Sequence, residues 1–199
     1  MRPLVAVPMK PFSSAKGRLA EVLDAEARVS LMQETAGRIV RAADTAGALA
    51  VVVTGDPQVA SWAHSRGIEV LAEPPGGGLN GAARAAADGA AAAGAVWCIV
   101  HGDLPLLTPG HLTAALAAAT SGVAVLAPSR TGGTNLIAAR TPIEFRYGPG
   151  SFSRHLAAFA SERCKVLVST GTALDLDTPA DLAAAAALPG GAWLVPYLT

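Results

Sequence analysis

The chain has 199 residues, of which 51% are hydrophobic, and its 15 basic side chains balance 15 acidic ones. This composition excludes an intrinsically disordered protein, and zero net charge argues against a nucleic-acid-binding surface, which normally needs an excess of Lys and Arg. No stretch is apolar over the roughly 20 residues of a membrane span, and the N-terminal apolar run is too short for a signal peptide. We therefore expect a cytoplasmic protein without membrane or nucleic-acid partners, folded as a single domain over residues 1–199.

Short apolar runs, which predict strands, alternate along the chain with longer segments of helical periodicity. Strands are predicted at residues 4–8, 48–56, 68–74, 95–103, 122–129, 135–140 and 164–170, and the tail 190–197 is expected to add an edge strand. Helices are predicted at residues 24–43, 57–67, 79–94, 108–120, 151–163 and 178–188. Thr108 and Ser151 are the expected N-caps of two of these helices.

This alternation predicts an α/β fold, because parallel strands need crossover connections that helices supply. We expect a three-layer sandwich with a mostly parallel central sheet. In such sheets ligands bind beyond the carboxyl ends of the strands, so functional residues should follow the apolar runs directly.

The first strand is followed by the basic sequence VPMKPFSSAKGRL, which contains Lys10, Lys16 and Arg18. Three cations in one strand-to-helix loop can surround a polyphosphate. The alternative is a solvated basic loop, but the chain has only three lysines and two of them lie here. This loop is neither a P-loop motif nor a dinucleotide fingerprint.

Three aspartates follow apolar runs elsewhere. Asp103 is the last residue of the strand predicted at 95–103, which ends in HGD. Asp175 and Asp177 stand two apart in LDLDTPADL, so they share one side of an extended segment. Asp103 alone could be a turn residue, but three carboxylates together repel one another and suit one or two Mg²⁺ ions. Asp181 follows Thr178 by three residues, so it reads as the acid of a capping box and is left out of the site.

Two glycine-rich loops, TGGTNLIAAR and YGPGSFSRH, supply further polar groups. Thr134 offers a hydroxyl, and Gly148 and Ser151 open a helix whose N-terminus can bind a phosphate or a carboxylate. The alternatives are a glycine turn and a serine cap, and His155 is interpreted as a packing or capping residue. A basic loop, an acidic set and an α/β sheet together suggest nucleotidyl or phosphoryl transfer.

Six motifs resemble a known family in order and spacing: VPMKPFSSAKGRL, GGGLN, HGDLPLL, GGTN, YGPGSFSRH and LDLDTPADL. They are similar to those of the 2-phospho-L-lactate/phosphoenolpyruvate guanylyltransferases, the CofC/FbiD-type enzymes of coenzyme F-420 biosynthesis. The resemblance runs from about residue 4 to residue 188. It implies a nucleotidyltransferase fold of glycosyltransferase-A type. It also implies a reaction that joins GMP from GTP to a phosphorylated three-carbon acid and releases pyrophosphate.

The resemblance further implies roles for individual residues. Asp103 and Lys16 would be catalytic. The metal site would be formed by Asp103, Asp175 and Asp177, and the acceptor site by Thr134, Gly148 and Ser151. The nucleotide would be bound by Lys10, Lys16, Arg18, Glu73 and Asn80. The chain departs from the expected pattern at Gly17, which removes a hydroxyl near the triphosphate, and at His101 with Gly102.

Several alternatives remain at this level. The composition suggests a GC-rich bacterial genome and favours phosphoenolpyruvate over 2-phospho-L-lactate or 3-phospho-D-glycerate as acceptor. A nucleotidyltransferase for a sugar phosphate or a molybdenum cofactor would carry the sequence L-x-G-G-x-S-x-R-M-G after the first strand, which this chain lacks. A non-catalytic nucleotide-binding module of the same fold is another alternative. A homodimer and a transient contact with the downstream phospholactyl transferase are further expectations.

Overall fold

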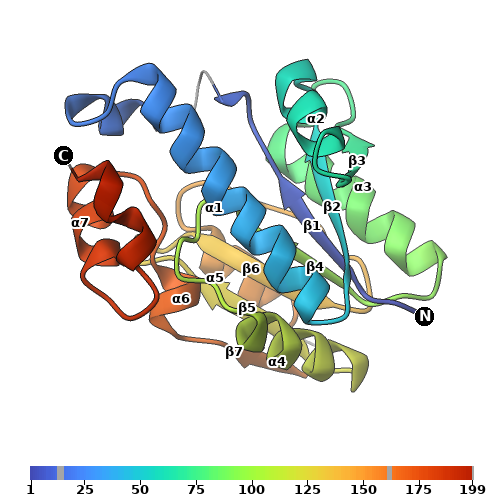
Figure 1. Ribbon diagram of the computed structural model, residues 1–199. Coiled ribbons are helices and arrows are strands. Elements are labelled where there is room, and N and C mark those ends of the chain that lie inside the picture. Colours follow the sequence, from blue (N-terminus) through green and yellow to red (C-terminus); the bar gives the residue numbers. More distant parts are fainter. Residues whose placement is uncertain (13–15, 161–162, 199) are drawn as a thin grey trace.

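The computed structural model describes residues 1–12, 16–160 and 163–198. The described strands form one sheet of seven, with helices on both faces (Figure 1). Their bounds are β1 Leu4–Pro8, β2 Leu49–Thr54, β3 Glu69–Ala72, β4 Trp97–Val100, β5 Ala124–Pro128, β6 Thr134–Ala139 and β7 Cys164–Val166. The predicted three-layer α/β fold is confirmed.

The strand order is β3-β2-β1-β4-β6-β5-β7, and only β6 runs against its neighbours β4 and β5 among the strands described. A short connection explains the reversal, because a crossover to a parallel neighbour needs a dozen residues or more. The other pairings are parallel, so the prediction of a mostly parallel sheet holds.

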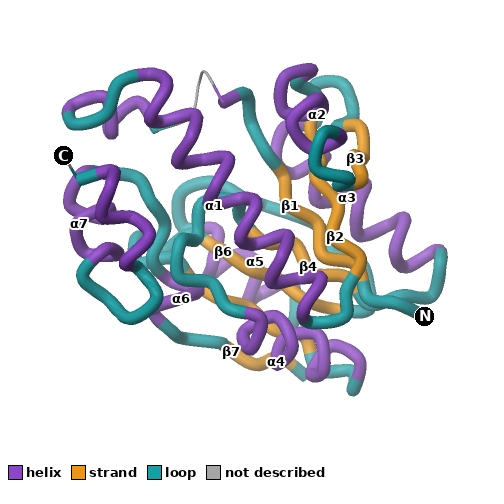
Figure 2. Tube along the Cα trace, in the orientation of Figure 1, coloured by secondary structure: helices purple, strands orange, loops and turns teal. Residues whose placement is uncertain are grey.

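Helices and helical turns connect these strands, as the tube in Figure 2 shows. The α-helices are α1 Ala25–Thr45, α2 Pro57–His64, α3 Gly78–Ala92, α4 Pro109–Thr120, α5 Ser151–Ala158, α6 Thr170–Ala173 and α7 Pro179–Ala186. The 3₁₀ helices η2 Gly17–Glu21 and η3 Ala192–Tyr197 lie before and after this set in the described part of the chain. Among the described residues, no helix combines the length and hydropathy that crossing a membrane requires.

Two apolar layers hold the helices to the sheet. Helices α1, α2 and α4 cover one face, and α3 covers the other with five buried alanines. Small side chains let a helix approach the strands closely, and Trp97 of β4 is fully buried in the same layer. Cys98 is buried on the opposite side of β4 as a free thiol, whose pKa burial raises.

Three local predictions are wrong. The tail forms the 3₁₀ helix η3 rather than an edge strand, because Leu194 is buried in a third apolar cluster that includes Leu182 of α7. Helix α5 begins at Ser151 but its N-cap is Gly150, which has a left-handed φ of 67° that glycine adopts without strain. The strand expected to run to Thr170 ends at Val166, and Ser169 caps the short helix α6.

Candidate active site

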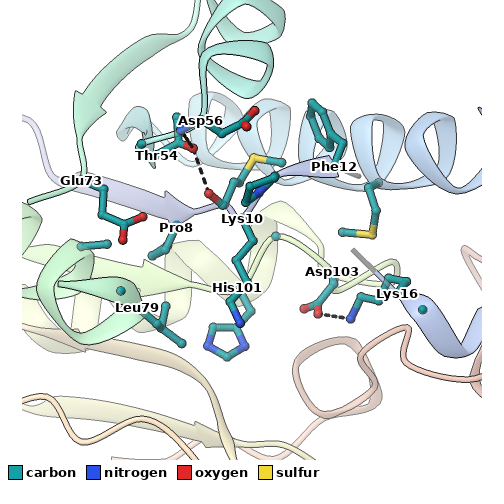
Figure 3. Close-up of a pocket in the computed structure, with 18 of the residues that line it drawn as sticks. Pro8, Lys10, Phe12, Lys16, Thr54, Asp56, Glu73, Leu79, His101 and Asp103 are labelled. Carbon is teal, nitrogen blue, oxygen red and sulfur yellow. Dashed lines mark hydrogen bonds and ion pairs between the residues drawn. The ribbon is translucent and has the colours of Figure 1, made fainter. Parts of the chain in front are cut away.

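The carboxyl ends of β1, β2, β3 and β4 open into a pocket of about 850 Å³ (Figure 3). Parallel strands bring these ends to the same edge of the sheet, as the fold predicts. The pocket is lined by residues of segments 8–12, 16–18, 54–56, 73–79 and 101–103 and by Asp177. Residues 13–15 of the basic loop lie outside the described residues.

The three predicted aspartates come together, and two of them, Asp103 and Asp177, line the pocket. One carboxylate oxygen each from Asp103, Asp175 and Asp177 lies within 4.8 Å of the others, and we call these residues the acidic cluster. The backbone N–H of Leu176 donates to the carbonyl of Asp103 at 3.1 Å, which joins the two chain segments. The Leu176 side chain is fully buried, so the aspartates on either side of it face the other way.

Lys16 lies inside the acidic cluster. Its Nζ is 2.5 Å from Asp103 Oδ2 and 2.6 Å from Asp177 Oδ1. Its backbone has a left-handed φ of 58°, which is uncommon for a residue with a side chain. The sequence predicts the basic loop and the aspartates as opposed charges across a ligand. The structure instead brings Lys16 into direct contact with the carboxylates.

The protonation of the acidic cluster follows from this contact. Burial, together with the neighbouring Asp103 and Asp177, raises the pKa of Asp175 to about 6. Burial also opposes the charge on Asp103, but Lys16, His101 and hydrogen bonding together outweigh it and lower the pKa of Asp103. In the same way, burial would lower the pKa of Lys16, and the two carboxylates raise it instead.

The acidic cluster fits a divalent cation. It offers carboxylate oxygens, which Mg²⁺ and Mn²⁺ prefer. Asp103 Oδ1 is buried and has no hydrogen-bond partner among the described residues. At Asp175, burial and the two neighbouring carboxylates outweigh the nearby Lys16 and raise the pKa, and a bound cation would add positive charge there.

Of the predicted nucleotide-binding residues, Lys10, Lys16, Arg18 and Glu73 line the pocket. Glu73 lies across the pocket from the Lys16–Asp103 pair in Figure 3, and its carboxylate makes no hydrogen bond or ion pair with the residues described. Asn80 is not among the described lining residues. Its Oδ1 accepts a hydrogen bond of 2.7 Å from the backbone N–H of Tyr147, so it joins α3 to the loop before α5.

Two of the three predicted acceptor residues meet beside the pocket without lining it. Thr134 begins β6 and Ser151 begins α5, and their hydroxyl oxygens lie 3.2 Å apart, both residues being 1% exposed. Gly148, with a φ of 123°, lies in the loop just before α5. Sequence reasoning missed one partner, because His155 Nδ1 lies 2.9 Å from Thr134 Oγ1. Its position four residues after Ser151, on the same helix face, is the signal that could have found it.

His101 connects the pocket with these hydroxyls. It lines the pocket, and its backbone N–H donates to the carbonyl of Asn135, next to Thr134, at 3.0 Å. The centroid of its ring lies 5.3 Å from that of the Tyr147 ring, and the Tyr147 centroid lies 4.8 Å from that of the His155 ring. The other departure from the expected pattern, Gly17, borders open space. A Cβ added at this residue would meet no atom within 4 Å.

Comparison with known proteins relates the chain to one family. Residues 3–188 match the family model described as guanylyl transferase CofC like. A phosphoenolpyruvate guanylyltransferase of Sphaerobacter thermophilus is 37% identical, over 92% of this chain and 91% of that protein. One from Rubrobacter xylanophilus is 38% identical, over 92% of this chain and 93% of that protein.

Solved structures show the same fold at lower sequence identity. A protein of Desulfovibrio desulfuricans G20, provisionally named a nucleotide-diphospho-sugar transferase, has a TM-score of 0.79 at 17% identity, covering 98% of this chain and 95% of its own. A nucleotidyl transferase from Methanothermobacter thermautotroptrophicus has a TM-score of 0.64 at 18% identity, covering 92% and 95%. The fold is therefore the one that nucleotidyltransferases use, as predicted.

Proposed function

Because the chain belongs to the family of CofC-like guanylyl transferases, we propose that it transfers GMP from GTP to phosphoenolpyruvate and releases pyrophosphate. The observation that carries the proposal is the name shared by relatives that are 37% and 38% identical over 92% of this chain. The pocket supports it, because basic residues and an acidic cluster meet at the carboxyl edge of a nucleotidyltransferase sheet.

The transfer is a displacement at the α-phosphorus of GTP. A phosphate oxygen of the acceptor forms a bond to this phosphorus, and the bond from the phosphorus to the bridging oxygen of the β-phosphate breaks. The electron pair of that bond leaves with pyrophosphate. A phosphate dianion is a nucleophile at neutral pH, so the chain need not remove a proton, and its residues act by binding and positioning.

The phosphates of GTP are assigned to Lys10, Lys16 and Arg18, with Lys16 and Asp103 as the catalytic pair. Asp103, Asp175 and Asp177 would hold one or two Mg²⁺ ions. Bound there, Mg²⁺ would neutralise the charge that develops on the α-phosphate and on pyrophosphate. The Lys16 ammonium, which contacts Asp103 and Asp177, would donate hydrogen bonds to the phosphates.

Glu73 is assigned to the guanine base. A carboxylate repels phosphates, and Glu73 lies on the side of the pocket away from Lys16 and Asp103 (Figure 3). Guanine presents two neighbouring donors, its N1–H and its 2-amino group, to such a carboxylate, whereas adenine presents an acceptor at N1. Asn80 acts at the same end by holding Tyr147, which belongs to the loop that contains Gly148.

The phosphate and carboxylate of the acceptor are assigned to Thr134, Gly148 and Ser151, beside His101. Phosphoenolpyruvate, 2-phospho-L-lactate and 3-phospho-D-glycerate all carry these two groups. The relatives' name favours phosphoenolpyruvate. In the family that the sequence resembles the guanylylated product is labile, so we also propose transient contact with the phospholactyl transferase that consumes it. We further propose a cytoplasmic location.

A pyrophosphate-release assay tests the function. The protein is incubated with Mg²⁺, one of GTP, ATP or CTP, and one of the three phospho-acids or a sugar phosphate. We expect release with GTP and phosphoenolpyruvate. Release with a sugar phosphate alone would identify a different nucleotidyltransferase. GTP binding without release for every acceptor would identify a non-catalytic nucleotide-binding module.

A further inference from the structure

His155 lies fully buried one turn into α5 and contacts both parts of the region assigned to the acceptor. Its Nε2 accepts a hydrogen bond of 2.9 Å from the backbone N–H of Arg146, two residues before Gly148. Its Nδ1 lies 2.9 Å from Thr134 Oγ1, which is 3.2 Å from Ser151 Oγ.

The contact with Arg146 determines which ring nitrogen carries the proton. A backbone N–H can only donate, so Nε2 must be an unprotonated acceptor. A neutral imidazole then has its hydrogen on Nδ1. Burial, followed by the nearby Arg154 and His101, lowers the pKa of His155 to about 4, which agrees with a neutral ring. His155 therefore donates from Nδ1 to Thr134.

This direction of donation decides what the hydroxyls can do. Since Thr134 Oγ1 accepts from His155, its own hydrogen points elsewhere, either to Ser151 Oγ or to a ligand. If it points to Ser151, the Ser151 hydroxyl hydrogen is in turn free for the ligand. An anion accepts hydrogen bonds and offers none, so it needs donors of this orientation. With the opposite tautomer, Thr134 would donate to the imidazole and present lone pairs to the anion.

We propose that His155 is a positioning residue that orients the hydroxyls of Thr134 and Ser151 as hydrogen-bond donors toward an anionic group of the acceptor. The same ring fixes the backbone of Arg146, so the hydroxyls and the Gly148 loop are held by one side chain. This inference rests on the proposed function, because it takes the acceptor to bind at Thr134 and Ser151.

The test is the steady-state kinetics of His155→Asn. The asparagine amide can approach Thr134 but cannot also accept from Arg146. We expect the KM for phosphoenolpyruvate to rise at least about tenfold, as the loss of an oriented hydrogen bond to a charged group predicts, with the KM for GTP within about twofold of wild type. A folded variant with an unchanged KM for phosphoenolpyruvate would overturn the proposal.

The chain offers a matched control in His111. Its Nδ1 likewise accepts from a backbone N–H, that of Thr108, and its Nε2 contacts a hydroxyl, but this hydroxyl belongs to Ser169, which is not assigned to the acceptor. His111→Asn should cost stability and leave both KM values unchanged. If it raises the KM for phosphoenolpyruvate as much as His155→Asn does, the effect is one of general structure.

Two measurements separate this proposal from the function it rests on. ¹⁵N NMR of the wild-type protein reports the tautomer of His155 without any turnover, and a hydrogen on Nε2 or on both nitrogens would overturn the proposal even if His155→Asn does not fold. Calorimetric titration with phosphoenolpyruvate in the presence of Mg²⁺ and GDP should show weaker binding to Thr134→Val. If wild type binds but does not release pyrophosphate, only the proposed function fails.

Discussion

At the acidic cluster, neighbouring aspartates contribute differently to stability and to catalysis. Asp103 pairs with Lys16, whereas burial and two like charges raise the pKa of Asp175 to about 6. Asp175→Asn removes this repulsion, so we expect an unchanged or higher melting temperature together with a loss of turnover of about 10³-fold or more. Asp103→Asn should lose comparable activity but also stability, because it leaves Lys16 with less compensation.

Thermal denaturation without Mg²⁺ and kcat with Mg²⁺ check both variants. Wild-type turnover in Asp175→Asn would show that this residue does not belong to the metal site. Equal melting temperatures for the two variants would show that the Lys16–Asp103 pair does not contribute to stability.

Glu73 should decide which base the pocket accepts. Glu73→Gln keeps the shape but exchanges one acceptor oxygen for a donor and removes the charge, so guanine loses one partner of its paired donors. We expect the KM for GTP to rise about 10- to 100-fold, with the preference for GTP over ATP reduced and kcat changed much less. Competition between the two nucleotides in the transfer assay measures this. An unchanged preference would place the base elsewhere in the pocket.

His155 should make stability depend on pH. Its pKa is lowered to about 4 in the folded protein, against an ordinary value near 6.5, so the unfolded chain binds a proton first as pH falls. The stabilising contribution is complete above about pH 6.5 and is lost toward pH 4, a change of up to about 3 kcal/mol. Urea unfolding at pH 7 and pH 4.5 should show a smaller loss in His155→Asn than in wild type. An equal loss of stability in wild type and in His155→Asn would show that His155 does not cause this pH dependence.

At the scale of elements, strand and helix alternation could be predicted because each predicted element carries a clear apolar period. The exceptions are short or depend on tertiary contacts. Helix α6 has only four residues, and η3 forms where the burial of Leu194 outweighs the strand propensity of its neighbours. Helix α5 has its cap one residue earlier than expected, because the Ser151 hydroxyl is directed to Thr134.

The acidic cluster could also be predicted, since strand ends and the two-residue spacing of Asp175 and Asp177 are local signals. The position of Lys16 could not. It depends on contacts across 87 and 161 residues of sequence, which no local pattern encodes. Nor could the sequence predict that Asn80 bonds to Tyr147, because that contact joins helix α3 to a loop 67 residues away along the chain.

The start of α7 links helix capping to the metal site. Thr178 Oγ1 accepts from the Asp181 backbone N–H at 3.2 Å, and Asp181 Oδ2 accepts from the N–H groups of Thr178 and Asp177 at 2.9 and 3.3 Å. The predicted capping box is therefore confirmed. Thr178→Ala should lower the free energy of unfolding by about 1 kcal/mol and raise the Mg²⁺ concentration for half-maximal activity, because Asp177 is less well held.

Thr108→Ala is the matched control, since Thr108 caps α4 and also precedes a proline. It should cost similar stability without changing the Mg²⁺ requirement. Mg²⁺ titrations of activity and urea unfolding of both variants measure these effects. If Thr178→Ala and Thr108→Ala need the same Mg²⁺ concentration for half-maximal activity, the α7 cap does not influence the metal site.

At the scale of the whole molecule, Lys16 ties the beginning of the chain to its middle and its end. It precedes η2, and its ammonium contacts Asp103 after β4 and Asp177 before α7. The apolar cluster beneath joins the same regions, because Leu19 of η2 and Leu182 of α7 are buried in it together. The Lys16 ammonium thus links three parts of the chain at the place where a cation is expected to bind.

Lys16→Met should therefore change stability in a metal-dependent way. Without Mg²⁺ the variant leaves the carboxylates uncompensated, and since Asp103 and Asp177 are 18% and 48% exposed we expect a loss of about 1–3 kcal/mol. With Mg²⁺ the loss should shrink, because the cation no longer competes with the ammonium and stabilises the folded state by binding to it. Melting temperatures across a Mg²⁺ series measure this difference.

Lys10→Met provides the control, because Lys10 lies in the same basic loop and makes no ion pair with the described residues. Its melting temperature should equal that of wild type at every Mg²⁺ concentration. Transfer activity should fall in both variants, so activity alone cannot separate the two roles of Lys16. A Mg²⁺-induced stabilisation of Lys16→Met no larger than that of wild type would mean that the ammonium and the cation do not share the acidic cluster. Asp103 and Asp177 would then form ion pairs with Lys16 and would not bind the cation.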